Sequence, residues 1–129
     1  MARVLVIAWK GEASGEMLLA FDEHGHEVET TEPKDGAVAV AKQQLPDVIC
    51  VDLGEQPNFG REVARVLAKT KATREIPMVL YGVDAETEPR AKTAAPRAVL
   101  IAQRQPKLVM AAVKKALSHR IKDYDDDDL

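Results

Sequence analysis

The sequence is poor in cysteine and in long apolar stretches, and each shortage excludes a class of protein. Cys50 is the single cysteine among 129 residues, which excludes an intramolecular disulfide and a cysteine-ligated metal site. No apolar run approaches the length of about 20 residues that a membrane-spanning helix requires, and none near the start has the form of a signal peptide. We therefore expect a soluble, cytoplasmic chain the size of one domain, with no membrane partner.

Charge is distributed unevenly, although the formal net charge is only −3. Residues 1–60 carry 4 basic and 11 acidic side chains, whereas residues 61–122 carry 14 basic and 5 acidic ones. The basic residues are spread over segments with an apolar face, which is typical of solvated helix surfaces, so we expect no nucleic-acid partner. Residues 123–129 contain five aspartates and almost nothing to bury. We expect a disordered acidic tail there, after a folded domain of residues 1–122.

Five short segments have the composition of β-strands, and each is followed by a segment with helical periodicity. The strands are expected at residues 3–8, 26–31, 47–53, 77–83 and 98–102, and the helices at about residues 13–24, 36–45, 61–71, 84–94 and 106–120. Four of the strands are nearly continuous apolar runs, which is typical of strands covered on both faces of a parallel sheet. The second strand is more polar and is expected at a sheet edge.

The strict alternation of strands and helices predicts an α/β fold with three layers. Right-handed crossovers and the number of strands favour a flavodoxin-like, five-stranded parallel sheet with the strand order 2-1-3-4-5. In such sheets the functional site lies at the carboxyl ends of the strands, near the point where the strand order reverses. Here that point is marked by Ala8–Lys10, after the first strand, and by Asp52–Gly54, after the third.

Several of these segments resemble one known family. Residues 45–53, followed by Gly60–Val63, resemble the third strand and the following loop of response-regulator receiver domains. Residues 74–80 resemble the approach to the fourth strand of that family, and residues 106–117 resemble its last helix. The resemblance extends from Arg3 to Leu117. It implies a receiver fold and a role in two-component phosphorelay signal transduction.

The family's chemistry is the transfer of a phosphoryl group from a kinase histidine to an aspartate, assisted by Mg²⁺. The resemblance places the phosphoacceptor at Asp52, which is retained. It places the acidic pair that holds Mg²⁺, the Thr/Ser, the Lys and the aromatic switch residue at positions that have all lost the required group: Ala8 and Trp9, Gly82, Ala102, and Val99. Because Mg²⁺ demands oxygen ligands, Ala8 and Trp9 cannot hold it.

The chain is therefore identified as a degenerate member, a pseudo-receiver. We expect a signalling module that is not an enzyme, uses no metal or cofactor, and acts through protein–protein contact without Mg²⁺-dependent phosphorylation. One alternative is a response regulator that a partner histidine kinase still phosphorylates on Asp52. A second alternative is a small flavodoxin-like ligand binder or enzyme.

Two residues beside Asp52 each have two interpretations. Lys10 either approaches Asp52 as a point charge, in place of the lost cation, or faces solvent. Trp9 either fills the vacated pocket or anchors a partner, and the structural role is favoured.

The family's usual partner surface corresponds here to about residues 84–120, which are rich in basic side chains. The proposed partner face consists of Arg97, Arg104, Lys107, Lys114 and Lys115. A basic face favours an acidic protein partner, either a signalling kinase or an effector, whose binding weakens as salt rises. The alternative is that these side chains only solvate two amphipathic helices.

Overall fold

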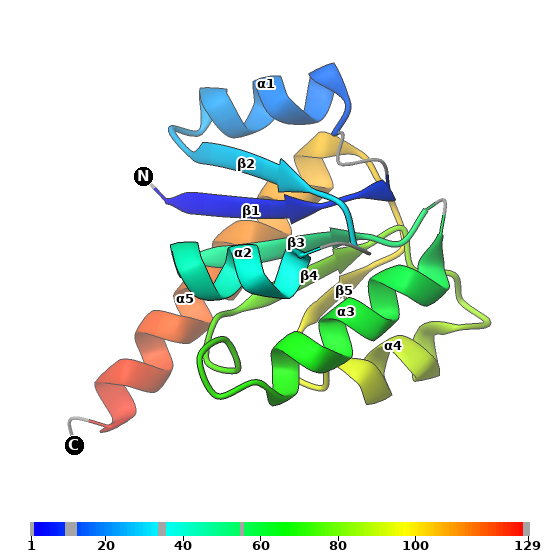
Figure 1. The fold of residues 1–129 in the computed structure, drawn as a ribbon. Coiled ribbons are helices and arrows are strands. Elements are labelled where there is room, and N and C mark those ends of the chain that lie inside the picture. The colour runs from blue at the N-terminus through cyan, green and yellow to red at the C-terminus, as the bar shows by residue number, and fades with distance from the viewer. Residues whose placement is uncertain (1, 10–12, 34–35, 55, 128–129) are drawn as a thin grey trace.

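The computed structural model describes residues 2–9, 13–33, 36–54 and 56–127, with the side chains of the last helix described through Ser118. Its elements alternate without exception from strand to helix (Figure 1). In chain order they are β1 (Arg3–Ile7), α1 (Gly15–Glu23), β2 (Glu27–Thr31), α2 (Ala37–Gln44), β3 (Val48–Asp52), α3 (Pro57–Lys69), β4 (Met78–Tyr81), α4 (Glu88–Ala94), β5 (Val99–Ile101) and α5 (Pro106–Asp127).

The five strands form one parallel sheet in the order β2-β1-β3-β4-β5, as the sequence predicts. The register places Ile7 beside Val51, and Asp52 beside Tyr81. The carboxyl ends of β1, β3, β4 and β5 therefore meet along one edge of the sheet. The polar strand β2 is the edge strand next to β1. Its residues are half-buried or exposed, as is expected of a strand with a neighbour on one side only.

Alternate residues of each central strand point to opposite faces, so the sheet has a separate apolar core on each side. Leu5, Ile49 and Leu80 pack with α2, α3 and α4 on one face, and Val6, Cys50 and Val79 pack with α1 and α5 on the other. Figure 1 views the sheet from the side of α2, α3 and α4, with α5 behind. This double burial explains why the strands read as continuous apolar runs.

The structure differs from the sequence-based boundaries at three helices. Helix α3 begins at Pro57, four residues before its expected start at residue 61, because proline is favoured in the first turn of a helix. The expected helix over residues 84–94 begins only at Glu88, because the Asp84 carboxylate accepts a hydrogen bond from the Glu86 N–H and forms a turn first. Helix α5 continues through Asp127, into the segment expected to be disordered. Once a helix is nucleated, each added residue gains a backbone hydrogen bond without a new nucleation cost. The domain boundary at residue 122 stays a prediction.

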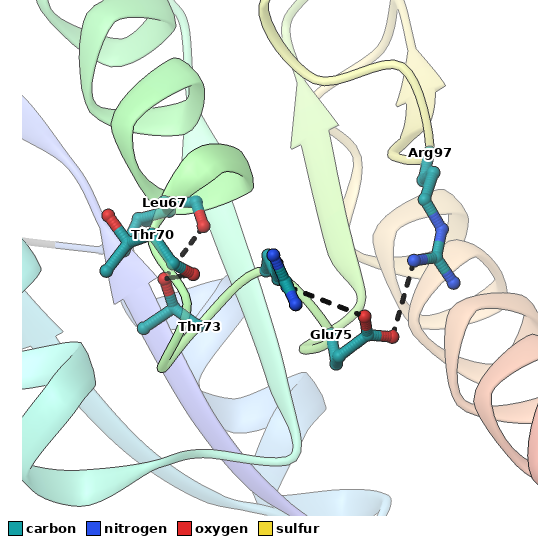
Figure 2. Close-up of polar contacts among 6 residues, drawn as sticks. Leu67, Thr70, Thr73, Glu75 and Arg97 are labelled. Atoms are coloured by element: carbon teal, nitrogen blue, oxygen red, sulfur yellow. Dashed lines mark hydrogen bonds and ion pairs between the residues drawn. The ribbon is translucent and has the colours of Figure 1, made fainter.

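The connection from α3 to β4 is built on one buried threonine (Figure 2). Thr73 is 1% exposed, and its hydroxyl donates a 2.7 Å hydrogen bond to the Leu67 carbonyl oxygen at the end of α3. The Thr73 N–H donates to the Thr70 carbonyl oxygen. These bonds satisfy carbonyls that the helix end leaves unpaired, and they direct the chain into β4.

Among the described residues, no helix is long and apolar enough to cross a membrane.

Candidate functional site at the carboxyl edge of the sheet

Asp52 is the last residue of β3 and lies at the centre of the carboxyl edge. Its side chain is only 11% exposed. One carboxylate oxygen, Oδ1, accepts a 2.8 Å hydrogen bond from the Gly54 N–H. The other, Oδ2, lies 2.5 Å from Nη2 of Arg104, in the loop between β5 and α5. Both oxygens of the expected phosphoacceptor therefore already have a donor.

Arg104 reaches Asp52 across two glycines. A Cβ atom placed on Gly54 would lie 2.8 Å from Cζ of Arg104, and one placed on Gly82 would lie 3.2 Å from its Cγ and Cδ atoms. Gly82 also has a φ of +76°, which is costly for residues with a side chain. Because neither glycine has a side chain, Arg104 has room to reach Asp52. Gly82 lies at the position where the resemblance places the family's hydroxyl residue.

Among the described residues, the positive charge beside Asp52 comes from Arg104, which the sequence analysis assigns to the partner face and not to the site. Lys10, the expected substitute cation, lies outside the described residues. Ala102, at the family's lysine position, is exposed and has no charge. Arg104 departs from the family's spacing, so the resemblance gave no signal for it. A signal was available in the topology, because a basic residue after the fifth strand lies at the same edge as Asp52.

An aromatic stack lies at the same edge of the sheet, after β1 and at the start of α3. The Trp9 ring, after β1, stacks on the Phe59 ring at the start of α3, with centroids 5.6 Å apart and planes 13° apart. Helix α3 also approaches β3 closely at Gly60, where a Cβ would lie 2.5 Å from Cδ2 of the buried Leu53. Trp9 therefore packs on Phe59 at this edge of the fold, and whether it fills the vacated pocket or anchors a partner stays a prediction.

Among the residues that the structure describes at this edge, the side chains do not fit the divalent cation that the family uses. Ala8 is buried and Trp9 is aromatic, so neither offers the oxygen ligand that Mg²⁺ needs. The remaining carboxylate, Asp52, faces a guanidinium cation, which repels a second positive charge. Within the described ranges, no group of three or more His, Cys, Asp or Glu side chains is arranged to hold a metal ion.

Two titratable groups near Asp52 are held in their neutral forms. Burial raises the pKa of the Cys50 thiol to about 12, which leaves it unreactive. Burial, and next the negative charge of Asp52, raise the pKa of the Tyr81 hydroxyl well above its usual range. Neither group offers a nucleophile or a general base at neutral pH.

The structure separates the five residues expected to form the partner face. Arg104 contacts Asp52 at the carboxyl edge, whereas Arg97 lies before β5, at the amino ends of the strands, and pairs with Glu75 (Figure 2). Val99, at the aromatic switch position, is partly buried against α5. Lys107, Lys114 and Lys115 are exposed on α5 and keep the basic character of that helix. Whether this surface binds a partner stays a prediction.

Comparison with known proteins agrees with this fold. No family model matches the chain. Protein PilH of Pseudomonas aeruginosa is 30% identical over 89 residues, which cover 68% of this chain and 74% of PilH. The signal receiver domain of a modulated diguanylate cyclase from Desulfovibrio desulfuricans G20 superposes with a TM-score of 0.72 at 23% identity, covering 95% of this chain and 98% of that one.

A second solved structure gives the same result at lower identity. The chemotaxis response regulator CheY4 of Vibrio cholerae superposes with a TM-score of 0.74 at 19% identity, covering 90% of this chain and 98% of that one. These structures establish the class by its fold, which is the flavodoxin-like receiver fold. The likeness to PilH goes further, and the chain belongs to the response-regulator receiver family of two-component signalling. Receiver domains are signalling modules that contact kinases and effectors.

Proposed function

We propose that this chain is a pseudo-receiver: a cytoplasmic signalling module that binds a partner protein and does not depend on Mg²⁺-assisted phosphorylation of Asp52. The observation that carries the proposal is the ion pair between Asp52 and Arg104. An aspartate must expose a carboxylate oxygen to attack a phosphoryl group in line. Here one oxygen accepts from Arg104 and the other from the Gly54 N–H.

The surroundings of Asp52 support the same conclusion. In phosphoryl transfer, metal ions and a lysine neutralise the charge on the transferred group. Ala8 and Trp9 supply no metal ligand, Ala102 supplies no ammonium, and Gly82 supplies no hydroxyl. The positive charge of Arg104 is instead spent on the resting carboxylate. The negative charge of the Asp52 carboxylate, which phosphorylation would alter in an active receiver, is thus balanced by Arg104 in the folded chain.

The partner surface that we propose is the exposed lysine face of α5. Lys107, Lys114 and Lys115 are all exposed, and no acidic residue occurs between Pro106 and Ser118. Such a face attracts an acidic partner over about 8 Å at physiological salt. Since Arg104 joins the loop before α5 to β3, this face is held in one position and stays available without a phosphorylation signal.

The phosphorylation state is tested by incubating the full chain with Mg²⁺ and acetyl phosphate and measuring its intact mass. We expect no phosphoryl adduct, while a receiver that retains both acidic residues gains one under the same conditions. An adduct that disappears in the Asp52→Asn variant would overturn the proposal in favour of a phosphorylated response regulator. Trp9 fluorescence is a second readout, and we expect no saturable change with millimolar Mg²⁺.

The partner surface is tested by charge reversal. Lys107, Lys114 and Lys115 are changed together to Glu, and the matched control changes three exposed lysines on the opposite side of the sheet, Lys42, Lys69 and Lys71. We expect partner capture or biological output to fall only in the α5 variant. Equal loss in both variants would show a general charge effect, and unchanged output in a folded α5 variant would reject this surface.

A further inference from the structure

Helices α1 and α5 lie side by side on one face of the sheet, and their outer surfaces carry opposite charges. They share one apolar core, with Met17 and Phe21 of α1 and Val109 and Val113 of α5 pointing inward. The outer surface of α1 carries acidic residues and no basic ones: Glu16, Asp22 and Glu23. The outer surface of α5 carries the three lysines described above and, through Ser118, no acidic residue.

Leucines interrupt the charges on both outer surfaces. Leu18 and Leu19 of α1 are 40% and 58% exposed, and Leu108 of α5 is 39% exposed. These three are among the five large apolar side chains that the described part of the chain leaves exposed. A patch of leucines bordered by charges is typical of a protein-contact surface.

The order of groups along the two helices also matches. Both helices begin at the carboxyl edge of the sheet and run in the same direction (Figure 1). Along α1 the order is one acid, two leucines and two acids, and along α5 it is one lysine, one leucine and two lysines. At about 1.5 Å per residue, Glu16 and Asp22 are about 9 Å apart along the helix axis, and Lys107 and Lys114 are about 10 Å apart.

We infer that α1 and α5 together form a self-complementary surface that binds a second copy of this chain. A twofold axis parallel to the two helices places α1 of each copy against α5 of the other. Glu16 then faces Lys107, the leucines meet, and Asp22 and Glu23 face Lys114 and Lys115. A twofold axis perpendicular to the helices would instead set acid against acid and lysine against lysine, which costs free energy.

The inference is independent of whether Asp52 accepts phosphate, because it uses no residue of the carboxyl-edge site. It shares the three lysines with the proposed partner surface, so the test must separate the two. Variants of α1 do this: they leave the lysine face of α5 unchanged for a partner, and they remove its complement in a second copy.

The test is sedimentation of the full chain over a concentration series up to about 1 mM, since a contact of this size belongs among the weaker interfaces. We expect the mass to double with rising concentration and to return toward the monomer at high salt. The Glu16→Lys, Asp22→Lys, Glu23→Lys variant and the Lys107→Glu, Lys114→Glu, Lys115→Glu variant should each stay monomeric. An equimolar mixture of the two should again form dimers, because both contacts regain opposite charges.

Each other outcome overturns the inference. A wild-type chain that stays monomeric over the whole series shows that the surface does not self-associate. A mixture that fails to dimerise, although both variants are folded by circular dichroism, shows that α1 and α5 do not face each other. Masses that grow beyond a dimer indicate open head-to-tail chains and reject the twofold arrangement.

Discussion

Two arginine–carboxylate pairs lie at opposite ends of the sheet, and they differ in how much water surrounds them. At the carboxyl edge, Arg104 meets a carboxylate that is 11% exposed and that also accepts a backbone N–H. At the amino edge, Arg97 and Glu75 lie 3.4 Å apart, with side chains 65% and 74% exposed (Figure 2). An exposed pair contributes about 0–1 kcal/mol, whereas a carboxylate shielded from water depends on its donors.

The comparison shows that the same chemical pair has two roles in one fold. The pair of Arg97 with Glu75, with Arg74 3.9 Å from the same carboxylate, borders the turn that leads into β4. The hydrogen bonds of the buried Thr73, and not this exposed pair, shape that turn. The pair of Arg104 with Asp52 joins the loop after β5 to the end of β3, across 52 positions of sequence. Four predictions follow from this contrast, in order of decreasing effect.

The largest effect is expected for Gly82→Thr, which restores the side-chain type of active receivers. We expect a loss of about 2–3 kcal/mol in the free energy of unfolding, because a β-branched residue is strained at positive φ and its Cβ would press on Arg104. Urea denaturation measures the loss. The control is Gly25→Thr, where φ is +75° and a Cβ meets nothing within 4 Å. Equal losses at the two positions would show that Arg104 adds nothing at Gly82.

The second prediction compares the two arginines directly. Arg104→Met leaves the shielded Asp52 carboxylate without its charged donor, and we expect a loss of about 1–2 kcal/mol in the free energy of unfolding. Arg97→Met removes the exposed pair, and we expect a change within about 0.5 kcal/mol. Both substitutions remove one positive charge, so the difference between the two denaturation midpoints reports the environment. Similar midpoints would contradict the distinction between the two edges.

The third prediction breaks the Asp52 pair without removing a charge. Gly54→Ala places a Cβ 2.8 Å from the guanidinium carbon of Arg104, so the flexible arginine must move away from Asp52. We expect a loss of up to about 1 kcal/mol, the usual value of one hydrogen bond. Gly15→Ala is the control, because a Cβ there meets nothing within 4 Å; since Gly15 begins helix α1, we expect this variant to be as stable as wild type or more stable. If neither Gly54→Ala nor Arg104→Met lowers the free energy of unfolding, the pair does not stabilise the loop.

The smallest effect concerns pH and a third point of the fold, beside the start of β1. His26 accepts a 3.2 Å hydrogen bond from the Ala2 N–H at Nδ1, and burial, followed by the nearby charge of His24, lowers its pKa below the usual 6.5. Because the folded state binds this proton more weakly than the unfolded chain, stability falls as the pH drops through about 6.5.

Denaturation at pH 7.5 and pH 5.5 measures this dependence. His26→Asn keeps an acceptor at the same place but does not titrate, so we expect the variant to lose part of the decrease seen in wild type. His24→Asn removes the neighbouring charge together with the ring that stacks on His26, and it should weaken the response without abolishing it. A decrease of the same size in His26→Asn as in wild type would assign the pH dependence to other groups.

Much of the fold follows from local pattern. Apolar runs such as residues 48–52 predict strands buried on both faces, and the alternation with helices predicts the parallel order that the structure has. Asp52 was also placed correctly at the carboxyl edge of β3. Helix α4 was predicted four residues too early, because the turn at Asp84 satisfies backbone groups that a helix would otherwise use.

The sequence by itself therefore determined the elements, their order and the edge at which the site lies, because hydrophobic periodicity and crossover handedness act locally along the chain. Together with the family resemblance, it also predicts that the usual groups of a metal-assisted phosphotransfer site are missing, since Ala8, Trp9, Gly82 and Ala102 carry no suitable side chain. Only the tertiary structure decided which cation meets Asp52. That choice depends on the parallel sheet bringing the loop after β5 beside the end of β3, and on two glycines leaving room for the arginine side chain.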